Sequence, residues 1–365
     1  MRSNFILPKD KPVPPVEKLG FGQYYTPYMY VRRYRQNKWE DSIITDYELL
    51  AVDPASQMIH YGQLIFEGLK AYYNKDQEKV YLFRPEENAK RYIKSAIRLC
   101  IPQLPVADFI DSVKAAVKFS GPYIPAYSKK NPTPASLYIR PFLMGTTPKL
   151  GVKPAQDYGH VVITSPSGPY FSGGLNPIKL KVEEVYTRAA PGGTGEAKCA
   201  GNYAASLMAA EIAHSEGYDQ VLWLDVTRTY IQEVGAMNVF LVKDNVLITP
   251  DLSGTILPGI TRDSVMKLAS SHFGMKVEER PVSIDEIIKG IKEKKVTEIF
   301  GSGTAAVITP VGALGYKGET CTVGNGEIGT VARKMYDTLI GIQYNEIQVD
   351  CAKDWVIEIK DILLK

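Results

Sequence analysis

Lys198 is the first residue of this sequence whose setting suggests chemistry. It lies in the segment GGTGEAKCAG (192–201), among small and flexible residues and directly before a strongly helical pattern. A lysine amine can form a Schiff base when its surroundings lower its pKa and leave it free to swing between two partners. Glycines on both sides allow an aromatic ring to approach closely. A solvated loop lysine is the competing interpretation.

Three other places could bind a phosphate group. The segment LPGITR (257–262) leads into a predicted helix, so the amides of Ile260 and Thr261 and the Thr261 hydroxyl could face an anion at the helix N-terminus. A GSGT motif ending at Thr304 follows a predicted strand and could form a backbone nest with a hydroxyl attached. Arg84, at the start of another predicted helix, could supply the counter-charge. Each feature also occurs as an ordinary cap or turn without any ligand.

Glu233 is an acidic residue inside a mainly apolar strand pattern, YIQEVGAMN (230–238). A buried carboxylate needs a partner. The protonated nitrogen of a pyridine ring would be one, and the resulting ion pair would keep that ring an electron sink. A structural ion pair inside the protein is the alternative.

The composition restricts the class of protein. The 365 residues exceed what one hydrophobic core usually serves, so we expect two domains. The 43 Lys and Arg residues nearly balance the 40 Asp and Glu residues, which argues against nucleic acid as a partner. The four cysteines form no CxxC pair, and neither a secretory leader nor an apolar stretch of about 20 residues is present. We therefore expect a cytoplasmic protein without a membrane segment or metal site.

The order of predicted elements indicates a mixed α/β chain. Strands are predicted over 28–34, 79–83, 136–143 and 160–165, with helices over 85–99 and 106–119. A helix is predicted over 202–216, followed by a strand meander between 221 and 249, a helix capped by Thr261 that runs to about 273, and a strand over 296–300. The turn formers of FSGGLNP (171–177) mark the best candidate for a linker.

With these residues in place, the chain is seen to resemble the branched-chain amino acid aminotransferases, which are fold type IV enzymes dependent on pyridoxal 5'-phosphate (PLP). The resemblance runs in order over nearly the whole chain. It rests on the following segments: HYGQLIFEG (60–68), LFRP (82–85), YIRP (138–141), the Lys198 segment, EVGAMN (233–238), LPGITR (257–262) and GSGTAA (301–306).

The resemblance implies a two-domain α+β fold. It places a smaller N-terminal α/β domain over residues 1–171, a linker over 172–184, and a larger C-terminal domain with a β-barrel-like core over 185–365. It also implies that Lys198 forms the Schiff base with PLP and moves the proton during transamination. Tyr203 would hydrogen-bond the phenolic oxygen of PLP, and Glu233 would pair with its ring nitrogen. The phosphate would be held by Arg84, Ile260, Thr261 and Thr304.

The substrate pocket must accept both an aliphatic side chain and the carboxylate arm of glutamate. The resemblance implies pocket walls at Phe66, Tyr170 and Ala236, and further walls that a neighbouring subunit of a homodimer donates at Tyr61, Leu150 and Val152. It assigns the α-carboxylate to Tyr138 and the amides of Thr304 and Ala305, and the glutamate side chain to Arg140, assisted by Tyr61 and Tyr170. A structural ion pair is the competing interpretation of Arg140.

Three alternatives remain open at this point. D-amino acid aminotransferases and aminodeoxychorismate lyases of the same fold would share the lysine, the glutamate and the phosphate site. A binding protein that keeps the scaffold without catalysis is a third reading. The YIR segment, the 60–68 segment and the chain length favour the branched-chain enzymes, and the joint presence of Lys198, Tyr203 and Glu233 disfavours a mere binding protein.

Overall fold

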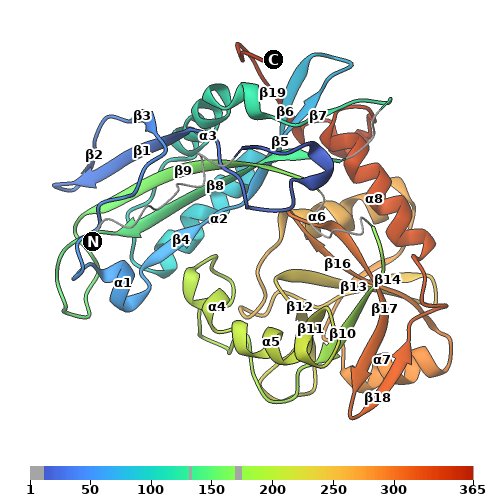
Figure 1. Cartoon of the computed structure of the whole chain (residues 1–365). Helices are drawn as coiled ribbons and strands as arrows, with labels where there is room; N and C mark the ends of the chain where they lie inside the picture. The colour runs from blue at the N-terminus through green and yellow to red at the C-terminus, as the bar shows by residue number, and fades with distance from the viewer. Residues whose placement is uncertain (1–11, 131–133, 169–174, 365) are drawn as a thin grey trace.

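The computed structural model describes residues 12–130, 134–168 and 175–364. It consists of two sheets with helices packed on and between them (Figure 1). The first sheet follows the order β19-β6-β5-β8-β9-β1-β2, with β3, β4 and β7 attached to β1, β8 and β5. Its strands are β1 Tyr28–Arg35, β2 Lys38–Trp39, β3 Ile43–Asp46, β4 Leu64–Phe66, β5 Leu69–Asn74, β6 Lys79–Phe83, β7 Ala126–Tyr127, β8 Ser136–Gly145, β9 Tyr158–Ser167 and β19 Val356–Ile359.

The second sheet closes into a barrel. Its path β12-β11-β10-β17-β16-β13 returns to its start through the β12–β13 pairing, while β14, β15 and β18 extend it outward. The fold is thus the predicted combination of a mixed α/β part and a barrel. The strands are β10 Ile178–Val182, β11 Gln220–Leu224, β12 Ile231–Val234, β13 Met237–Lys243, β14 Val246–Thr249, β15 Val277–Glu279, β16 Val296–Gly303, β17 Val307–Tyr316 and β18 Glu319–Thr322.

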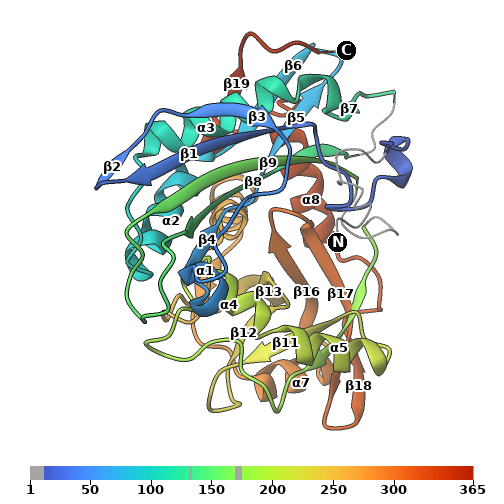
Figure 2. The ribbon, with the colours of Figure 1, turned by 60° about the vertical axis from the view of Figure 1, so that its left-hand side comes forward.

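The helices cover the sheets and fill the space between them, as Figure 2 shows from a second side. Helices α2 and α3 share one core with the first sheet, while α6 and α8 pack beside Phe240 and Phe300 of the barrel. The helices are α1 Gln57–Tyr61, α2 Pro85–Arg98, α3 Val106–Phe119, α4 Ala200–Ala204, α5 Leu207–Ser215, α6 Ile260–Lys267, α7 Ile284–Lys292 and α8 Thr330–Gln343. No helix within the described ranges is long and apolar enough to cross a bilayer.

The domain limits stay a prediction. Strand β10 falls inside the range 172–184 that was predicted to be a linker, and it pairs with β11 and β17 of the barrel. Strand β19, near the end of the chain, pairs with β6 of the first sheet. The C-terminal segment therefore returns to the sheet that the N-terminal half builds.

Two helix predictions are wrong in detail. The single helix expected over 202–216 is broken between α4 and α5, because the Tyr203 carbonyl accepts hydrogen bonds from both the amide and the hydroxyl of Ser206. The helix expected to begin at a Thr261 cap instead has Gly259 as its N-cap. Its predicted end near residue 273 is confirmed, because a π turn over Leu268–His272 continues α6 directly. Thr261 consequently lies in the first helical turn, where its amide has no partner within the helix.

The GSGT motif is also arranged differently from the expected nest. Gly301, Ser302 and Gly303 belong to β16. All three pair with residues of β17, and Gly301 and Ser302 also pair with residues of β13 on the other side. The ladders on both sides occupy these backbone groups. Thr304 begins the turn that joins β16 to β17, so the free amides of this region belong to 304–306.

The buried His160 makes the stability of the first sheet depend on pH. It is buried on β9, with its ring nitrogens 3.0 Å from the Tyr92 hydroxyl and 3.0 Å from the Ser112 hydroxyl. Burial lowers the pKa of His160 to about 3. Between pH 3 and 6.5 this histidine is therefore protonated in the unfolded chain and neutral in the folded chain. As the pH falls below 6.5, the free energy of unfolding decreases by about 1.4 kcal/mol per pH unit.

We predict that His160→Gln removes this part of the acid sensitivity. The loss in free energy of unfolding between pH 7 and pH 5, measured by urea titration, should be smaller than in the wild type by about 2 kcal/mol. His214→Gln, at an exposed histidine, is the control and should keep the wild-type pH dependence. Equal pH dependence in all three proteins would contradict the prediction.

Candidate active site

The backbone at Lys198 is fixed on both sides. Its amide donates to the Ser95 hydroxyl at 2.9 Å, and its carbonyl accepts the Phe66 amide at 3.0 Å. The next residue, Cys199, forms a β-bridge with Ile65. These contacts fix the backbone of Lys198 and leave only its side chain free to move.

Asn202 closes this loop from within. Its side-chain amide donates to the carbonyls of Thr194 and Ala197 at 2.7 and 2.8 Å, and its oxygen accepts the Thr194 hydroxyl at 2.7 Å. The sequence analysis did not select Asn202, since an asparagine at the start of a helix has many ordinary uses. Here it gives a glycine-rich segment a single conformation.

The amine of Lys198 points into a cavity beside two aromatic rings. Its Nζ donates to the Tyr203 hydroxyl at 2.8 Å and lies 5.0 Å from the centre of the Phe66 ring. The rings of Phe66 and Tyr203 have their centres 4.8 Å apart. The structure therefore joins the predicted lysine and tyrosine through a direct hydrogen bond.

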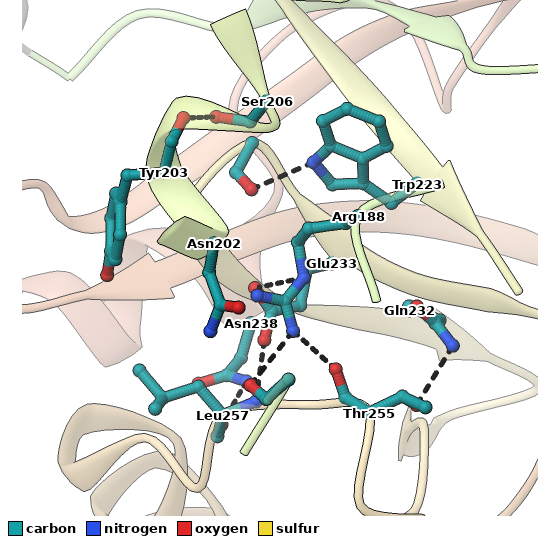
Figure 3. A network of polar contacts seen from close by, with 12 residues as sticks. Arg188, Asn202, Tyr203, Ser206, Trp223, Gln232, Glu233, Asn238, Thr255 and Leu257 are labelled. Atoms are coloured by element: carbon teal, nitrogen blue, oxygen red, sulfur yellow. Dashed lines mark hydrogen bonds and ion pairs between the residues drawn. The ribbon is translucent and has the colours of Figure 1, made fainter. Parts of the chain in front are cut away.

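Glu233 lies behind this pair, on the barrel strand β12, and only 3% of it is exposed (Figure 3). One carboxylate oxygen accepts the Leu257 amide at 2.8 Å, and the other lies 3.3 Å from Nε of Arg188. Burial raises the pKa of Glu233 above its usual value, although the charge of Arg188 acts in the opposite direction. The surrounding protein thus compensates this carboxylate only in part, and an additional cation would stabilise its charge.

Arg188 is a residue that the sequence analysis missed. Besides Glu233 it contacts the carbonyls of Gly195 and Thr255, which belong to the lysine loop and to the segment before α6. Figure 3 shows its guanidinium between Glu233 and Thr255. No local motif marks Arg188 in the sequence, because two of its three contacts, Glu233 and Thr255, are far from it in the chain.

Three of the four predicted phosphate residues, Ile260, Thr261 and Thr304, line the same cavity. Ile260 and Thr261 open α6, and Thr304 and Ala305 belong to the β16–β17 turn. Gly259 must be glycine here, because a Cβ atom would collide with the side-chain oxygen of Asn238. The amides of the first helical turn have no partners within the helix and form an anion-binding arrangement.

Arg84 lies at the back of this turn and does not line the main cavity. It adopts φ 49 as the N-cap of α2, and its guanidinium donates to the Ser264 hydroxyl at 2.7 Å and to the Ile260 carbonyl at 3.3 Å. It also pairs with Asp263 and lies 4.9 Å from the centre of the Trp355 ring. Arg84 therefore supports α6 from the outer side of the predicted phosphate position.

The other end of the cavity carries Tyr138 and Arg140, both on β8. Arg140 Nη2 donates to the Tyr138 hydroxyl at 2.9 Å, and the guanidinium carbon lies 4.7 Å from the centre of the Phe66 ring. Its Nε is buried and has no hydrogen-bond partner among the described residues. Gly68 faces Tyr138 so closely that a Cβ atom there would overlap the phenol oxygen.

One cavity of about 160 Å³ unites most of the predicted site residues. It is lined by Phe66, Tyr138, Arg140, Lys198, Tyr203, Ala236, Ile260, Thr261, Thr304 and Ala305. Glu233 lines a small adjoining space that also touches Tyr203 and Ala236. The structure thus brings the lysine, the amides of the turn and the arginine together around one cavity, with the acid in the space beside it.

Three predicted pocket residues lie outside this cavity in the single chain. Tyr61, Leu150 and Val152 are 42%, 63% and 82% exposed, and the Tyr61 hydroxyl donates to the Leu150 carbonyl. Tyr170, the remaining predicted wall, lies outside the described residues. Several further lining residues, Arg91 and Met237 among them, were not predicted as site residues.

Lys70 is another buried cation that sequence reasoning passed over. Its Nζ donates to the Ala305 carbonyl at 2.7 Å, and burial lowers its pKa to about 8. The bond turns the Ala305 carbonyl toward β5 and fixes the turn whose amides border the cavity. Lys70 is the one lysine of β5, and no motif around it in the sequence indicates that it holds the turn at Ala305.

Comparison with known proteins shows which family has this arrangement. Residues 64–314 match the family described as Amino-transferase class IV. The Branched-chain-amino-acid aminotransferase 2 of Bacillus subtilis (strain 168) is 47% identical over 335 residues, which cover 91% of this chain and 90% of the relative. The chain belongs to the branched-chain aminotransferases of this family. The Probable branched-chain-amino-acid aminotransferase of Staphylococcus aureus (strain N315) is 48% identical over 93% of both chains.

Solved structures of branched-chain aminotransferases share the fold. The Escherichia coli branched-chain amino acid aminotransferase matches with a TM-score of 0.73 and 28% identity, covering 91% of this chain and 99% of that one. The branched-chain amino acid aminotransferase from Thermobaculum terrenum, solved in its PLP-form, matches with a TM-score of 0.73 and 23% identity over 91% and 98% of the two chains. Sheet, barrel and interposed helices are therefore those of this aminotransferase family.

The Arg188–Glu233 pair of this aminotransferase can be tested without any ligand. We predict that Arg188→Met lowers the free energy of unfolding of the cofactor-free protein by about 3 kcal/mol, because it leaves Glu233 as a buried carboxylate without its cation. Adding Glu233→Gln should recover about half of that loss, since the uncompensated charge is then removed. Urea unfolding at pH 7.5 measures both. Purely additive losses in the double variant would show that the two side chains do not interact.

Proposed function

We propose that this chain is a PLP-dependent aminotransferase that exchanges the amino group between leucine, isoleucine or valine and 2-oxoglutarate, in both directions. One observation carries the proposal. One cavity contains the amine of Lys198, with an anion-binding turn at one end and Arg140 at the other. The Nε atom of Arg140 lacks a partner among the described residues. The branched-chain aminotransferase names of the relatives support the choice of substrate.

The residues present fit PLP at three points. The free amides of Ile260, Thr261 and Thr304 would hold its phosphate, with Arg84 behind the turn. The partly compensated carboxylate of Glu233 would pair with its ring nitrogen, and Tyr203 would donate to its phenolic oxygen. Bound PLP supplies an aldehyde that takes up the amino group and a ring that stores the electron pair left when the α-proton departs.

Lys198 acts at the amine end of this site. Its Nζ would carry the cofactor at rest and, once displaced by substrate, take the proton from the amino acid Cα and return it during the second part of the exchange. The fixed backbone lets the amine swing over a short arc without moving the loop. Phe66 and Tyr203 border that arc and limit the access of water.

The substrate would lie between the two ends. We assign the α-carboxylate to Tyr138 and to the amides of Thr304 and Ala305, all of which line the cavity. Phe66 and Ala236 offer apolar walls for a branched side chain. Arg140 would bind the side-chain carboxylate of glutamate with its unpartnered Nε.

The pocket would be completed by a second copy of the chain. Tyr61, Leu150 and Val152 are exposed apolar residues around α1 and the 147–155 loop, and burying them in a homodimer would remove this apolar surface from water. Tyr170 is proposed as a further wall on the basis of family likeness alone. We also propose that the enzyme is cytoplasmic, because its four cysteines are free, as is usual in a reducing compartment.

The function is tested by colour and by a substrate panel. The purified protein, reconstituted with PLP, should be yellow and should lose that absorbance on borohydride reduction, whereas Lys198→Ala should not gain it. Amino transfer should be measured from leucine, isoleucine, valine and D-alanine to 2-oxoglutarate. Activity with D-alanine alone would overturn the substrate assignment, and protein that cannot be reconstituted would overturn the enzyme assignment.

Arg140 should separate the two halves of the reaction. We predict that Arg140→Met raises KM for 2-oxoglutarate and glutamate by about tenfold or more, because one charged hydrogen-bond donor to a carboxylate is lost. KM for leucine should change less than threefold, since its side chain has no carboxylate. Steady-state kinetics with each substrate varied in turn gives the comparison. Equal increases for both substrates would mean that Arg140 only maintains the fold of the pocket.

A further inference from the structure

A second cavity borders the turn that joins β16 to β17. Its volume is about 250 Å³. Among the described residues it shares only Ala305 and Ala306 with the cavity that contains Lys198, and none of the residues that we assign to PLP lines it. The two cavities therefore have one turn as a common wall, and the second cavity plays no part in the proposed function.

Three elements that are far apart in the chain build this second cavity. Helix α8 contributes four residues that lie three or four positions apart, and therefore on one face of the helix: Arg333, Tyr336, Ile340 and Gln343. Strand β17 contributes residues 307–310, and β5 contributes Lys70 and Tyr72, whose side chains point to the same face of that strand. Figure 1 shows α8 beside β17, where the barrel meets the first sheet. The cavity thus lies at the boundary between the two sheets.

Lys70 is a buried cation in the wall of the second cavity. It is 7% exposed, and its ammonium group donates one hydrogen bond to the Ala305 carbonyl. An ammonium group has three protons to donate, and no carboxylate of the described residues forms an ion pair with this one. Its pKa of about 8 still leaves it mostly protonated at neutral pH. A buried charge without a counter-charge is unfavourable, so an anion in the cavity would stabilise Lys70.

Gln343 offers the opposite kind of group. It is 3% exposed at the end of α8, and its side-chain oxygen is buried without a hydrogen-bond partner among the described residues. Buried acceptors of this kind are rare in folded proteins, because they have lost their hydrogen bonds to water. Gln343 and Lys70 lie close together, since both also border a small space beside Thr304. The cavity thus has a place for an anion and, near it, a place for a hydrogen-bond donor.

The remaining lining residues restrict the charge and the shape of a ligand. No aspartate or glutamate is among the described residues that line the second cavity. Arg333 adds a second, half-exposed positive charge, although Asp337 lies 3.9 Å from it. Ile308 and Ile340 add apolar surface. These properties match a ligand with one carboxylate, one strong hydrogen-bond donor and a short aliphatic chain.

We propose that the second cavity is an additional amino acid site, which binds a small aliphatic α-amino acid in its zwitterionic form. The carboxylate would pair with the ammonium group of Lys70, and the α-ammonium group would donate to the side-chain oxygen of Gln343. Both groups of an α-amino acid are attached to one carbon atom, so a single small molecule satisfies two neighbouring partners with charged hydrogen bonds. The aliphatic side chain would lie against Ile308 and Ile340.

Occupation of this site acts on the first cavity through Lys70. The carboxylate of the ligand competes with the Ala305 carbonyl for the ammonium group. The amides of the same turn are those that we assign to the α-carboxylate of the substrate, so this coupling rests on the proposed function, whereas the binding itself does not. Val307, which follows the turn, has φ 62, which is unfavourable for a β-branched residue and depends on the surrounding contacts. A bound amino acid therefore changes the affinity for substrate.

The binding test uses protein whose first site cannot react. Borohydride reduction fixes PLP on Lys198, so that no added amine can form a Schiff base with it. Calorimetry then measures the binding of L-leucine, of 4-methylpentanoate, which lacks the ammonium group, and of 3-methylbutylamine, which lacks the carboxylate. Leucine should bind about tenfold more tightly than either analogue, because each analogue lacks one charged hydrogen bond. This comparison on the wild type does not depend on any variant.

Variants identify the cavity that binds leucine. Gln343→Met should weaken the binding about tenfold. Tyr138→Phe in the first cavity, and Gln348→Met at an exposed glutamine, are the controls and should leave it unchanged. Thermal unfolding of each variant identifies any protein that has failed to fold. Equal binding of leucine and 4-methylpentanoate, unchanged binding in Gln343→Met, or an equal loss in Tyr138→Phe would overturn the proposed site.

Kinetics test the coupling. The rate of amino transfer from leucine to 2-oxoglutarate, followed over a wide range of leucine concentrations, should depart from a single hyperbola in the wild type and follow one in Gln343→Met. Curves of the same shape in both proteins would overturn the coupling. A protein that takes up no PLP but binds leucine with these preferences would refute the proposed function and leave the second site intact, so the two failures are distinguishable.

Discussion

The closure of the barrel between β12 and β13 is the constraint on which the active site depends. This pairing sets Glu233 opposite Asn238, and the neighbouring ladder sets Asn238 opposite Ser302. Three residues from three separate strands therefore form one row at the edge of the barrel. Asn238 continues the row by donating to the Leu257 carbonyl, just before the anion-binding turn. If the ring were open at β12, the acid would keep its hydrogen bond from the Leu257 amide but would lose its place in this row.

Charge pairing around the cavity follows a consistent pattern. Three buried arginines, Arg84, Arg91 and Arg188, each have a carboxylate partner and serve to join segments. Arg140 differs because no carboxylate contacts it among the described residues and its neighbours are aromatic. Buried ion pairs add little net stability, but they fix geometry, and removing one partner is costly. The paired arginines therefore serve as framework, whereas Arg140 has no carboxylate partner among the described residues, which agrees with the ligand-binding role that we propose for it.

Much of this arrangement could be predicted from sequence because it depends on local patterns. The strand alternation and the helix over 85–99 were recovered closely, and the order of motifs identified the family before any geometry was known. The errors arose where tertiary contacts decide. Ser206 breaks a helix that periodicity alone would continue, and the Gly301 segment becomes a strand because barrel strands pair with it on both sides. Arg91 and Arg188 gave no sequence signal, since their carboxylate partners, Glu67 and Glu233, are remote from them in the chain.

The contact between Gly68 and Tyr138 restricts how this enzyme could be altered. Any side chain at position 68 would displace the phenol that we assign to the α-carboxylate, and with it the hydrogen bond from Arg140. Under the proposed assignment, the substrate range would then be changed at the proposed walls Phe66 and Ala236, both of which line the cavity. The same glycine that permits a close-packed binding site also makes one side of it unavailable to mutational change. A library for new substrates should keep position 68 constant and vary the cavity residues Phe66 and Ala236.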